Sequence, residues 1–253
     1  MKTVSLSRDM VHAGNLILVN REYPCRGARE TCRPVGQDSG SIFLTDRFAT
    51  IYTRLMDELS AWDQILPVSG WRSKQEQEQI YRDCISENGA EFTSKYVAFP
   101  GHSEHQTGLA LDLALNQPDI DAICPHFPYT GMCGTFREKA VHYGLVERYP
   151  DGKEGVTGIA NEPWHFRYVG VPHAALMEQN GFTLEEYLSW LRMFPYGGEP
   201  LRYGYGDKTI EIFYLSAGAE TTLFEVEEGP LYTVSGDNIN GFIITVWKEN
   251  HIQ

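Results

Sequence analysis

GHSEHQTGLALDL, residues 101–113, is the stretch that decides the fold at the centre of this 253-residue chain. From Gly108 onward, small or polar residues alternate with leucine, which is the period of a half-buried β-strand. Such a strand sends its leucines into the core and turns Gly108, Ala110 and Asp112 toward a cleft. His105 lies an odd number of residues before Asp112, so a bend before Gly108 is needed to bring both polar side chains to that cleft. We expect Gly108 and Ala110 to keep bulk away from whatever binds there.

A second stretch, NEPWHF at residues 161–166, predicts another strand. Pro163 disfavours a helix interior, and aromatic residues then alternate with His165 and Arg167, which is a strand pattern entered through a proline kink. His165 is therefore expected to face the cleft. Glu162 lies just before the strand, where a turned backbone can direct its carboxylate inward.

Together the two stretches supply the side chains of a hydrolytic zinc site. His105, Asp112 and His165 offer three nitrogen or oxygen ligands, which leaves the fourth tetrahedral position open for water. One bound Zn²⁺ can lower the pKa of that water to roughly 7, and a carboxylate outside the ligand set can then take its proton. Glu162 is the candidate for this base. A His-x6-Asp pair alone is more often structural, so the prediction depends on the conjunction of both stretches.

These spacings also carry a resemblance to a known family. The zinc D-alanyl-D-alanine peptidases of the VanY, VanX and VanXY group share a motif that this chain resembles at Ser103-x-His105-x-x-Gly108-x-Ala110-x-Asp112 and Glu162-Pro163-Trp164-His165. A third element, SGWRS at residues 69–73, is similar to the Ser-Gly-Tyr-Arg-Ser element of that group, with tryptophan at the aromatic position. The resemblance covers roughly residues 10–195.

The resemblance implies a role for each matching residue. These roles are zinc ligation by His105, Asp112 and His165, catalysis by Glu162 as the base and by Arg72, and substrate binding by Ser103 and Gln77. Arg72 corresponds to the residue that polarises the scissile carbonyl and stabilises the oxyanion. A guanidinium suits that task because it presents forked donors and stays protonated.

The fold implied by the resemblance is α+β, with a central antiparallel sheet that carries the zinc site and is flanked by helices. Capping and first-turn signals for helices occur at Thr45, at Ser73 with Glu76, at Thr135 with Glu138, at Pro172, and at Thr183 with Glu186. The stretches 86–98 and 113–136 are expected to be irregular. The second of these is interpreted as a rim or lid of the cleft, because long loops are often functional, with a variable surface loop as an equal alternative.

The character of the sequence changes after Pro195. A linker at residues 196–200 precedes short β-like runs separated by turn residues, at 209–214, 221–226, 231–234 and 241–247. We therefore expect a zinc D,D-peptidase domain over residues 1–195 and a small C-terminal β-rich extension over residues 196–253. The extension is interpreted as a packing appendage, with a role at the substrate edge or in dimerisation as the alternative.

The composition excludes some partners. A net charge of −13 argues against nucleic-acid binding or a polybasic membrane patch. The N-terminal residues MKTVSLSRD lack an apolar signal segment, and the chain has no apolar run near 20 residues. We therefore expect no membrane anchor and a cytoplasmic location. The sequence does not indicate an oligomeric state.

The remaining metal-binding residue types do not form a second pattern. The cysteines lack CxxC spacing and are expected to be reduced thiols, namely Cys25, Cys32, Cys84, Cys124 and Cys133. Cys124-Pro125-His126 with Cys133 lacks a fourth ligand. His102 is expected to support the loop beside the motif, and the other histidines, His12, His126, His142, His173 and His251, are expected to be ordinary surface or core residues.

The resemblance is strongest to the VanXY type and implies hydrolysis of the D-Ala-D-Ala dipeptide and of the terminal D-Ala of peptidoglycan precursor peptides. Removing both pools would support vancomycin resistance. Three alternatives stay open: a dedicated D,D-carboxypeptidase, a peptidoglycan endopeptidase, and a non-catalytic zinc-binding module that recognises the cell wall. The last would be expected to lose the base or the arginine, and both Glu162 and Arg72 are present.

Overall fold

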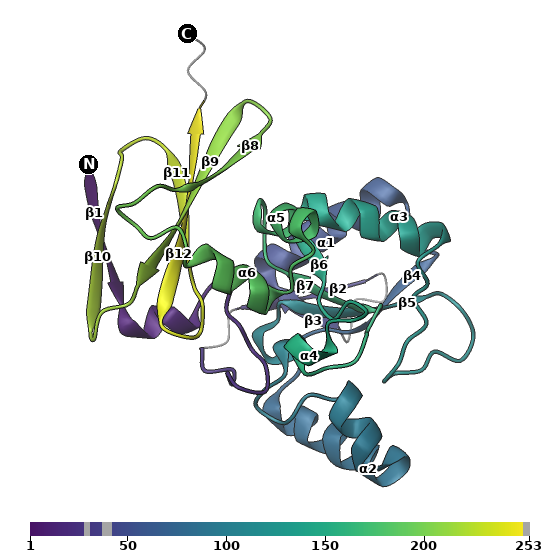
Figure 1. Ribbon diagram of the computed structural model, residues 1–253. Helices are drawn as coiled ribbons and strands as arrows, with labels where there is room; N and C mark the ends of the chain where they lie inside the picture. The colour runs from purple at the N-terminus through teal and green to yellow at the C-terminus, as the bar shows by residue number, and fades with distance from the viewer. Residues whose placement is uncertain (28–30, 37–41, 250–253) are drawn as a thin grey trace. The chain divides into compact units, whose positions relative to one another are not determined.

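The computed structural model describes residues 1–27, 31–36 and 42–249, which form two compact units (Figure 1). The larger unit consists of Val19–Cys25 and Arg29–Thr183, and the smaller unit consists of Met1–Leu18, Arg26–Ala28 and Leu184–Gln253. The units divide the chain differently from the expected boundary at residue 195, because the two ends of the chain contribute strands that pair with each other in the smaller unit.

The core of the larger unit is a four-stranded sheet in the order β4-β5-β7-β6, with every pair antiparallel. The strands are β4 (Ile65–Ser69), β5 (Ala110–Leu115), β6 (Leu145–Glu147) and β7 (His165–Tyr168). Asp112 of β5 pairs with His165 of β7 on one side and with Ser69 of β4 on the other. The expected central antiparallel sheet is confirmed, and its register places the two predicted ligand residues side by side.

The bend predicted before β5 is a short 3₁₀ helix, η2 (Glu104–Thr107), that ends at Gly108. Gly108 has φ 73°, a left-handed conformation that favours glycine. A Cβ atom there would lie 3.0 Å from Cys32 Sγ and 3.1 Å from Thr45 Cγ2. The expectation that Gly108 clears space for the bound ion is therefore wrong, because the side on which a Cβ atom would project faces Cys32 and Thr45.

Helices surround this sheet, with α1, α3 and α5 gathered on one side and α2 on the other (Figure 1). They are α1 (Asp46–Leu59), α2 (Lys74–Tyr96), α3 (Gly131–Ala140), α4 (Glu154–Thr157) and α5 (His173–Asn180), with a 3₁₀ turn, η3, at Val141–Tyr143. A separate two-stranded sheet is formed by β2 (Cys32–Val35) and β3 (Ile42–Thr45). None of the helices in the described ranges has both the length and the apolar character of a membrane span.

The predicted helix starts were right to different degrees. The capping box at the start of α2 is confirmed, since Ser73 accepts from the Glu76 N–H and the Glu76 carboxylate accepts from the Ser73 N–H. Thr45 is the N-cap of α1 but makes no side-chain capping bond. The predicted start of α3 at Thr135 is wrong, because that helix begins at Gly131. The expected irregular stretch 86–98 is also wrong, since α2 continues to Tyr96 across a kink at Gly89.

The smaller unit is mainly β-structure, as expected of the C-terminal extension. Its four-stranded sheet has the order β11-β12-β9-β8, and β1 pairs with β10. The elements are β1 (Lys2–Ser7), η1 (Arg8–His12), α6 (Leu184–Leu191), β8 (Leu201–Tyr205), β9 (Lys208–Ser216), β10 (Thr221–Val226), β11 (Leu231–Gly236) and β12 (Gly241–Glu249). Leu6 and Val11 from the N-terminal segment are buried with Phe224 and Phe242 in one apolar cluster. This packing explains why the first residues belong to this unit.

Candidate active site

The three predicted metal ligands converge from three elements of the larger unit. His105 comes from η2, Asp112 from β5 and His165 from β7. One ligand atom from each lies within 4.8 Å of the others. His105 Nε2 is 3.1 Å from Asp112 Oδ2, and His165 Nδ1 is 2.8 Å from Asp112 Oδ1. All three side chains are buried, so the aspartate lies between two imidazoles in a site that is largely shielded from water.

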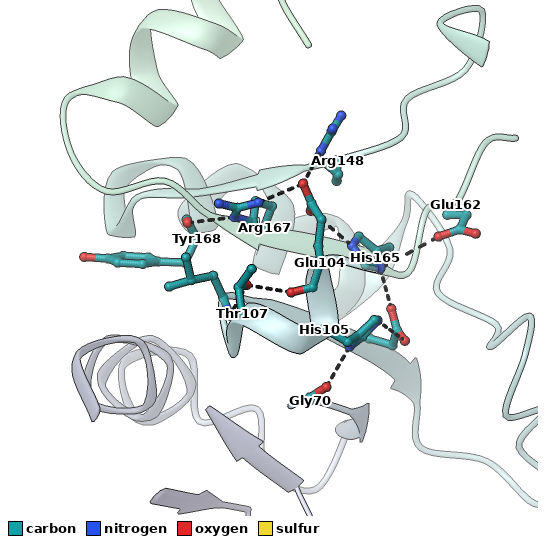
Figure 2. A network of polar contacts seen from close by, with 11 residues as sticks. Gly70, Glu104, His105, Thr107, Arg148, Glu162, His165, Arg167 and Tyr168 are labelled. Carbon is teal, nitrogen blue, oxygen red and sulfur yellow. Dashed lines mark hydrogen bonds and ion pairs between the residues drawn. The ribbon is translucent and has the colours of Figure 1, made fainter. Parts of the chain in front are cut away.

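This donor set fits one zinc ion. Nitrogen and oxygen ligands at 2.0–2.1 Å from tetrahedral zinc are about 3.3 Å apart, close to the 3.1 Å and 2.8 Å that separate Asp112 from the two imidazoles. His105 Nδ1 lies 2.7 Å from the Gly70 carbonyl oxygen (Figure 2). Because a carbonyl can only accept, Nδ1 carries the proton there and Nε2 keeps its lone pair for a metal. Two imidazoles and one carboxylate leave a fourth position open, which is the pattern of a catalytic site.

The segment that contains Arg72 is built onto the same cluster through its backbone. Gly70 approaches β3 so closely that a Cβ atom would lie 2.5 Å from the Phe43 carbonyl oxygen. The Trp71 N–H donates to that carbonyl, and the Arg72 N–H donates to the His105 carbonyl at 3.2 Å. Gly70 therefore has a steric reason to be glycine, and its own carbonyl is fixed against the His105 ring.

The Arg72 side chain is held by two hydrogen bonds at the edge of the cleft. Its Nη2 donates to Ser69 Oγ at 2.6 Å and its Nη1 to Gln77 Oε1 at 2.8 Å. Gln77 is itself buried and donates from Nε2 to the Ala98 carbonyl at 2.8 Å. The guanidinium is thus fixed in place beside the ligand cluster. Burial lowers the pKa of Arg72, and the Asp112 carboxylate is the largest opposing influence.

Glu162 lies beside the ligands without joining the cluster. Its Oε2 atom is 3.8 Å from His165 Nδ1, and its carbonyl accepts the His165 N–H at 3.1 Å. A hydrogen bond from the Glu162 N–H to the Tyr149 carbonyl fixes the turn before β7. Burial raises the pKa of Glu162 to about 8, helped by the Asp112 charge and opposed by His165 and Arg72. A carboxyl group with a pKa near neutrality is suited to moving protons.

A cavity of about 50 Å³ joins these groups. Its wall includes the ligands, Glu162 and Arg72, and also Gln77, Ser103, Tyr149 and Trp164. Ala122 and Ile123, from the irregular segment between β5 and α3, form part of the same wall. That segment therefore borders the cleft, as expected, although it ends at α3 five residues earlier than predicted.

Sequence reasoning missed a buried carboxylate next to the ligands. Glu104 Oε1 accepts from Arg148 Nε at 2.8 Å and from Arg167 Nη1 at 2.7 Å (Figure 2). All three side chains are fully buried. Burial raises the pKa of Glu104, but the two guanidiniums more than offset this and hold the pKa well below its usual range. Arg167 lies two residues after His165, so the predicted strand pattern places both side chains on one face. A guanidinium that faces a buried cleft needs an acidic partner, and this signal could have pointed to a carboxylate nearby.

His102 and the cysteines lie outside the ligand cluster in the described part of the chain. His102 Nδ1 donates to the Asn20 carbonyl at 2.8 Å and takes no part in the cluster. All five cysteines are free thiols. Within the described part of the chain, the only cluster of His, Cys, Asp or Glu that could hold a metal is the one formed by His105, Asp112 and His165.

Comparisons with known proteins point to one family. The family described as VanY, D-alanyl-D-alanine carboxypeptidase, matches residues 42–171. The bifunctional D-Ala-D-Ala dipeptidase and D-Ala-D-Ala carboxypeptidase VanXYC of Enterococcus gallinarum is 38% identical over 179 residues, which are 70% of this chain and 94% of that protein.

Two solved structures extend the comparison. The vancomycin-resistance D,D-dipeptidase VanXYg, in complex with a D-Ala-D-Ala phosphinate analogue, matches with a TM-score of 0.95 and 43% identity over 98% of this chain and 99% of that one. The D,D-pentapeptidase VanY from a VanB-type resistance cassette, in complex with Zn(II), matches with a TM-score of 0.58 and 29% identity over 69% of this chain and 98% of that one. The likeness to VanXYg therefore includes the C-terminal extension, beyond the 10–195 range of the sequence resemblance.

Proposed function

Because the chain belongs to the VanY family of D-alanyl-D-alanine carboxypeptidases, we propose that it is a zinc-dependent D,D-peptidase with two substrates. These are the D-Ala-D-Ala dipeptide and the terminal D-Ala of peptidoglycan precursor peptides, and their removal would support vancomycin resistance. The observation that carries the proposal is the buried cluster of His105, Asp112 and His165 with the Glu162 carboxylate beside it but outside the ligand set.

His105 Nε2, His165 Nδ1 and a carboxylate oxygen of Asp112 would hold the zinc ion. When bound there, the metal supplies Lewis-acid charge that activates water and polarises the scissile carbonyl. Asp112 contacts both imidazoles, so it also fixes their separation. The His105 ring is oriented by the Gly70 carbonyl, which leaves the nitrogen required for ligation free of a proton.

Glu162 would act as general base and then as general acid. Its carboxylate takes a proton from the attacking water as the tetrahedral centre forms, and returns it to the amine of the departing D-alanine. In the metal-free protein burial raises the pKa of Glu162 to about 8, and a group that burial pushes toward its protonated form is suited to taking up a proton and passing it on. The hydrogen bonds at the Glu162 backbone keep the group at the cleft throughout.

Arg72 would stabilise the negative charge that develops on the carbonyl oxygen. Its two hydrogen bonds to Ser69 and Gln77 fix the guanidinium before substrate arrives, so little reorganisation is needed when the charge appears. Gln77 would then contribute to substrate binding mainly by holding the Arg72 guanidinium in place. Ser103 lines the cavity and is proposed to contact the substrate directly.

The peptidase function is proposed for the larger unit, with the smaller β-rich unit as a packing appendage. This assignment modifies the division at residue 195, since residues 1–18 and 184–195 fall in the smaller unit. The cytoplasmic location stays a prediction, and cell fractionation with an antibody against the protein would check it.

The proposal is tested by measuring D-alanine release from D-Ala-D-Ala and from a precursor pentapeptide ending in D-Ala-D-Ala, side by side. Each reaction is run with the purified protein, after treatment with a chelator, and after zinc is added back. Cleavage of both substrates that is lost on chelation and restored by zinc is the expected result. Cleavage of the pentapeptide alone would assign a dedicated D,D-carboxypeptidase. Cleavage of neither by zinc-loaded protein would overturn the proposal in favour of an endopeptidase or a wall-recognition module.

A further inference from the structure

A buried carboxylate faces the outer side of one proposed metal ligand. We propose that Glu104 is a positioning residue that orients His165 for zinc through a hydrogen bond from the Nε2–H of that ring, with Arg148 and Arg167 fixing the carboxylate in place. This inference rests on the proposed zinc site and adds a residue that the motif does not assign to it.

The two nitrogens of His165 face different groups. Nδ1 lies 2.8 Å from Asp112 Oδ1 and 3.8 Å from Glu162 Oε2, which is the side where the ligands converge. Nε2 faces Glu104 Oε2 at 3.7 Å (Figure 2). Metal ligation through Nδ1 therefore requires the proton on Nε2, and that proton is directed at the carboxylate of Glu104.

On this outer side, His165 Nε2 and Glu104 Oε2 lie close together but are not hydrogen-bonded. A separation of 3.7 Å exceeds the usual hydrogen-bond limit of about 3.2 Å. Both His165 Nε2 and Glu104 Oε2 are buried, and neither has a hydrogen-bond partner within the described part of the chain. A small rotation of the ring toward Glu104 would satisfy both atoms. Metal ligands of this type commonly give their second N–H to a carboxylate, which fixes the orientation of the ring.

Arg148 and Arg167 hold the Glu104 carboxylate in position beside His165. Both guanidiniums bond to Glu104 Oε1 and leave Oε2 directed at the histidine. An anion between two cations remains an acceptor, so it cannot present a proton to the ring. Arg148 also lies over the ring of Tyr149 at 4.9 Å, and that ring lies 4.9 Å from the ring of His165. The network therefore contacts His165 at its edge and on one side.

Replacing Glu104 by glutamine tests this role with little change in shape. The amide can donate as well as accept, so the Glu104→Gln variant loses the strict selection of an N–H at Nε2. We expect its zinc dissociation constant, measured by competition with a chromophoric chelator, to rise by about 10- to 100-fold. The matched control is Glu211→Gln in the smaller unit, because Glu211 is also nearly buried and contacts two cations, Arg202 and Lys248. The control should keep the affinity of the parent protein.

A second readout distinguishes orientation from general stability. In the zinc-loaded parent protein, the Nε2–H proton of His165 should resonate far downfield in the NMR spectrum and exchange slowly with water, as expected of a charge-assisted bond. In zinc-loaded Glu104→Gln that resonance should move upfield and exchange faster. If this variant does not fold by circular dichroism, Glu104→Asp keeps the charge but withdraws it from the ring, and should weaken zinc binding in the same direction.

A folded Glu104→Gln protein with the zinc affinity and the His165 resonance of the parent would overturn the inference. So would weakened affinity with an unchanged resonance, because the effect would then not pass through the hydrogen bond. If the parent protein itself failed to bind zinc, the proposed function would fail as well. The parent measurement therefore separates the two failures.

Discussion

The two histidines of the cluster have the same proposed task but are supported in opposite ways. The ring of His105 is held by a backbone carbonyl, that of Gly70. The ring of His165 faces the Glu104 side chain, which is itself held by two buried arginines. Each side also carries one proposed catalytic group, because the backbone N–H of Arg72 donates to the His105 carbonyl and the backbone N–H of His165 donates to the Glu162 carbonyl. The His105 side is therefore specified by backbone geometry, and the His165 side by buried charge.

The largest expected effect is on the His165 side. Replacing Glu162 by glutamine removes the base but leaves all three ligands, so kcat should fall by about 10²- to 10⁴-fold while the zinc content stays at one ion per chain. D-alanine release and metal analysis on the same preparation check both parts. Glu154→Gln, at an exposed position in α4, is the control and should retain parent activity. Parent-like turnover by a zinc-loaded Glu162→Gln protein would remove Glu162 from the mechanism.

The His105 side should respond differently to the loss of its proposed catalytic group, Arg72. Arg72→Lys keeps a positive charge but loses the fork that bonds Ser69 and Gln77. Because the charge it stabilises develops in the transition state, kcat should fall by about 10²- to 10³-fold, with a smaller change in KM. Steady-state kinetics with D-Ala-D-Ala measures the two separately. A rise in KM at constant kcat would instead make Arg72 a simple substrate-binding residue.

The raised pKa of Glu162 predicts a pH dependence of stability in the metal-free protein. The folded state holds this proton up to about pH 8, whereas an unfolded chain releases it near 4.5. The folded state thus binds more protons between these values, and the stability that the group contributes at low pH is lost as the pH rises. Urea unfolding should show a decline of up to about 1.4 kcal/mol per pH unit that is absent in Glu162→Gln. Equal slopes in the two proteins would contradict the raised pKa.

The smallest expected effect tests the backbone support of His105. Gly70→Ala places a Cβ atom 2.5 Å from the Phe43 carbonyl, so the segment must shift and carry the Gly70 carbonyl away from His105. Zinc affinity should weaken by about tenfold, the lower end of the range for groups that orient a ligand. Gly155→Ala in α4 meets nothing within 4 Å and is the control. A Gly70→Ala protein with unchanged affinity would show that the carbonyl is not needed to orient the ring.

The sequence alone predicted those parts of the site that depend on local pattern. Alternation along 108–113 and 164–168 predicted that Asp112 and His165 face one cleft from two strands, and in the structure the two residues are paired across β5 and β7. Ser73 and Glu76 predicted the start of α2 because a capping box is completed within four residues. These features need no knowledge of distant parts of the chain.

What the sequence did not reveal depends on contacts between distant residues. Glu104, Arg148 and Arg167 meet only when three parts of the chain come together, namely η2, the residue that follows β6, and strand β7. The strand pattern indicates that Arg167 needs a partner, but nothing local identifies Glu104 as that partner or adds Arg148. The pairing of Lys2–Ser7 with Thr221–Val226 joins segments more than 200 residues apart, so local signals do not reveal it. Thr45 lies at the predicted cap, but its side chain makes no capping bond.

In the proposed site, two differently supported imidazoles and one carboxylate hold a single zinc ion. X-ray absorption at the zinc K edge, on protein loaded with one equivalent of zinc, tests it most directly. We expect two imidazole nitrogens and one or two oxygens, all at about 2.0–2.2 Å, with one of the imidazoles lost in a His165→Ala protein. A sulfur ligand at about 2.3 Å, or a spectrum that His165→Ala leaves unchanged, would contradict it.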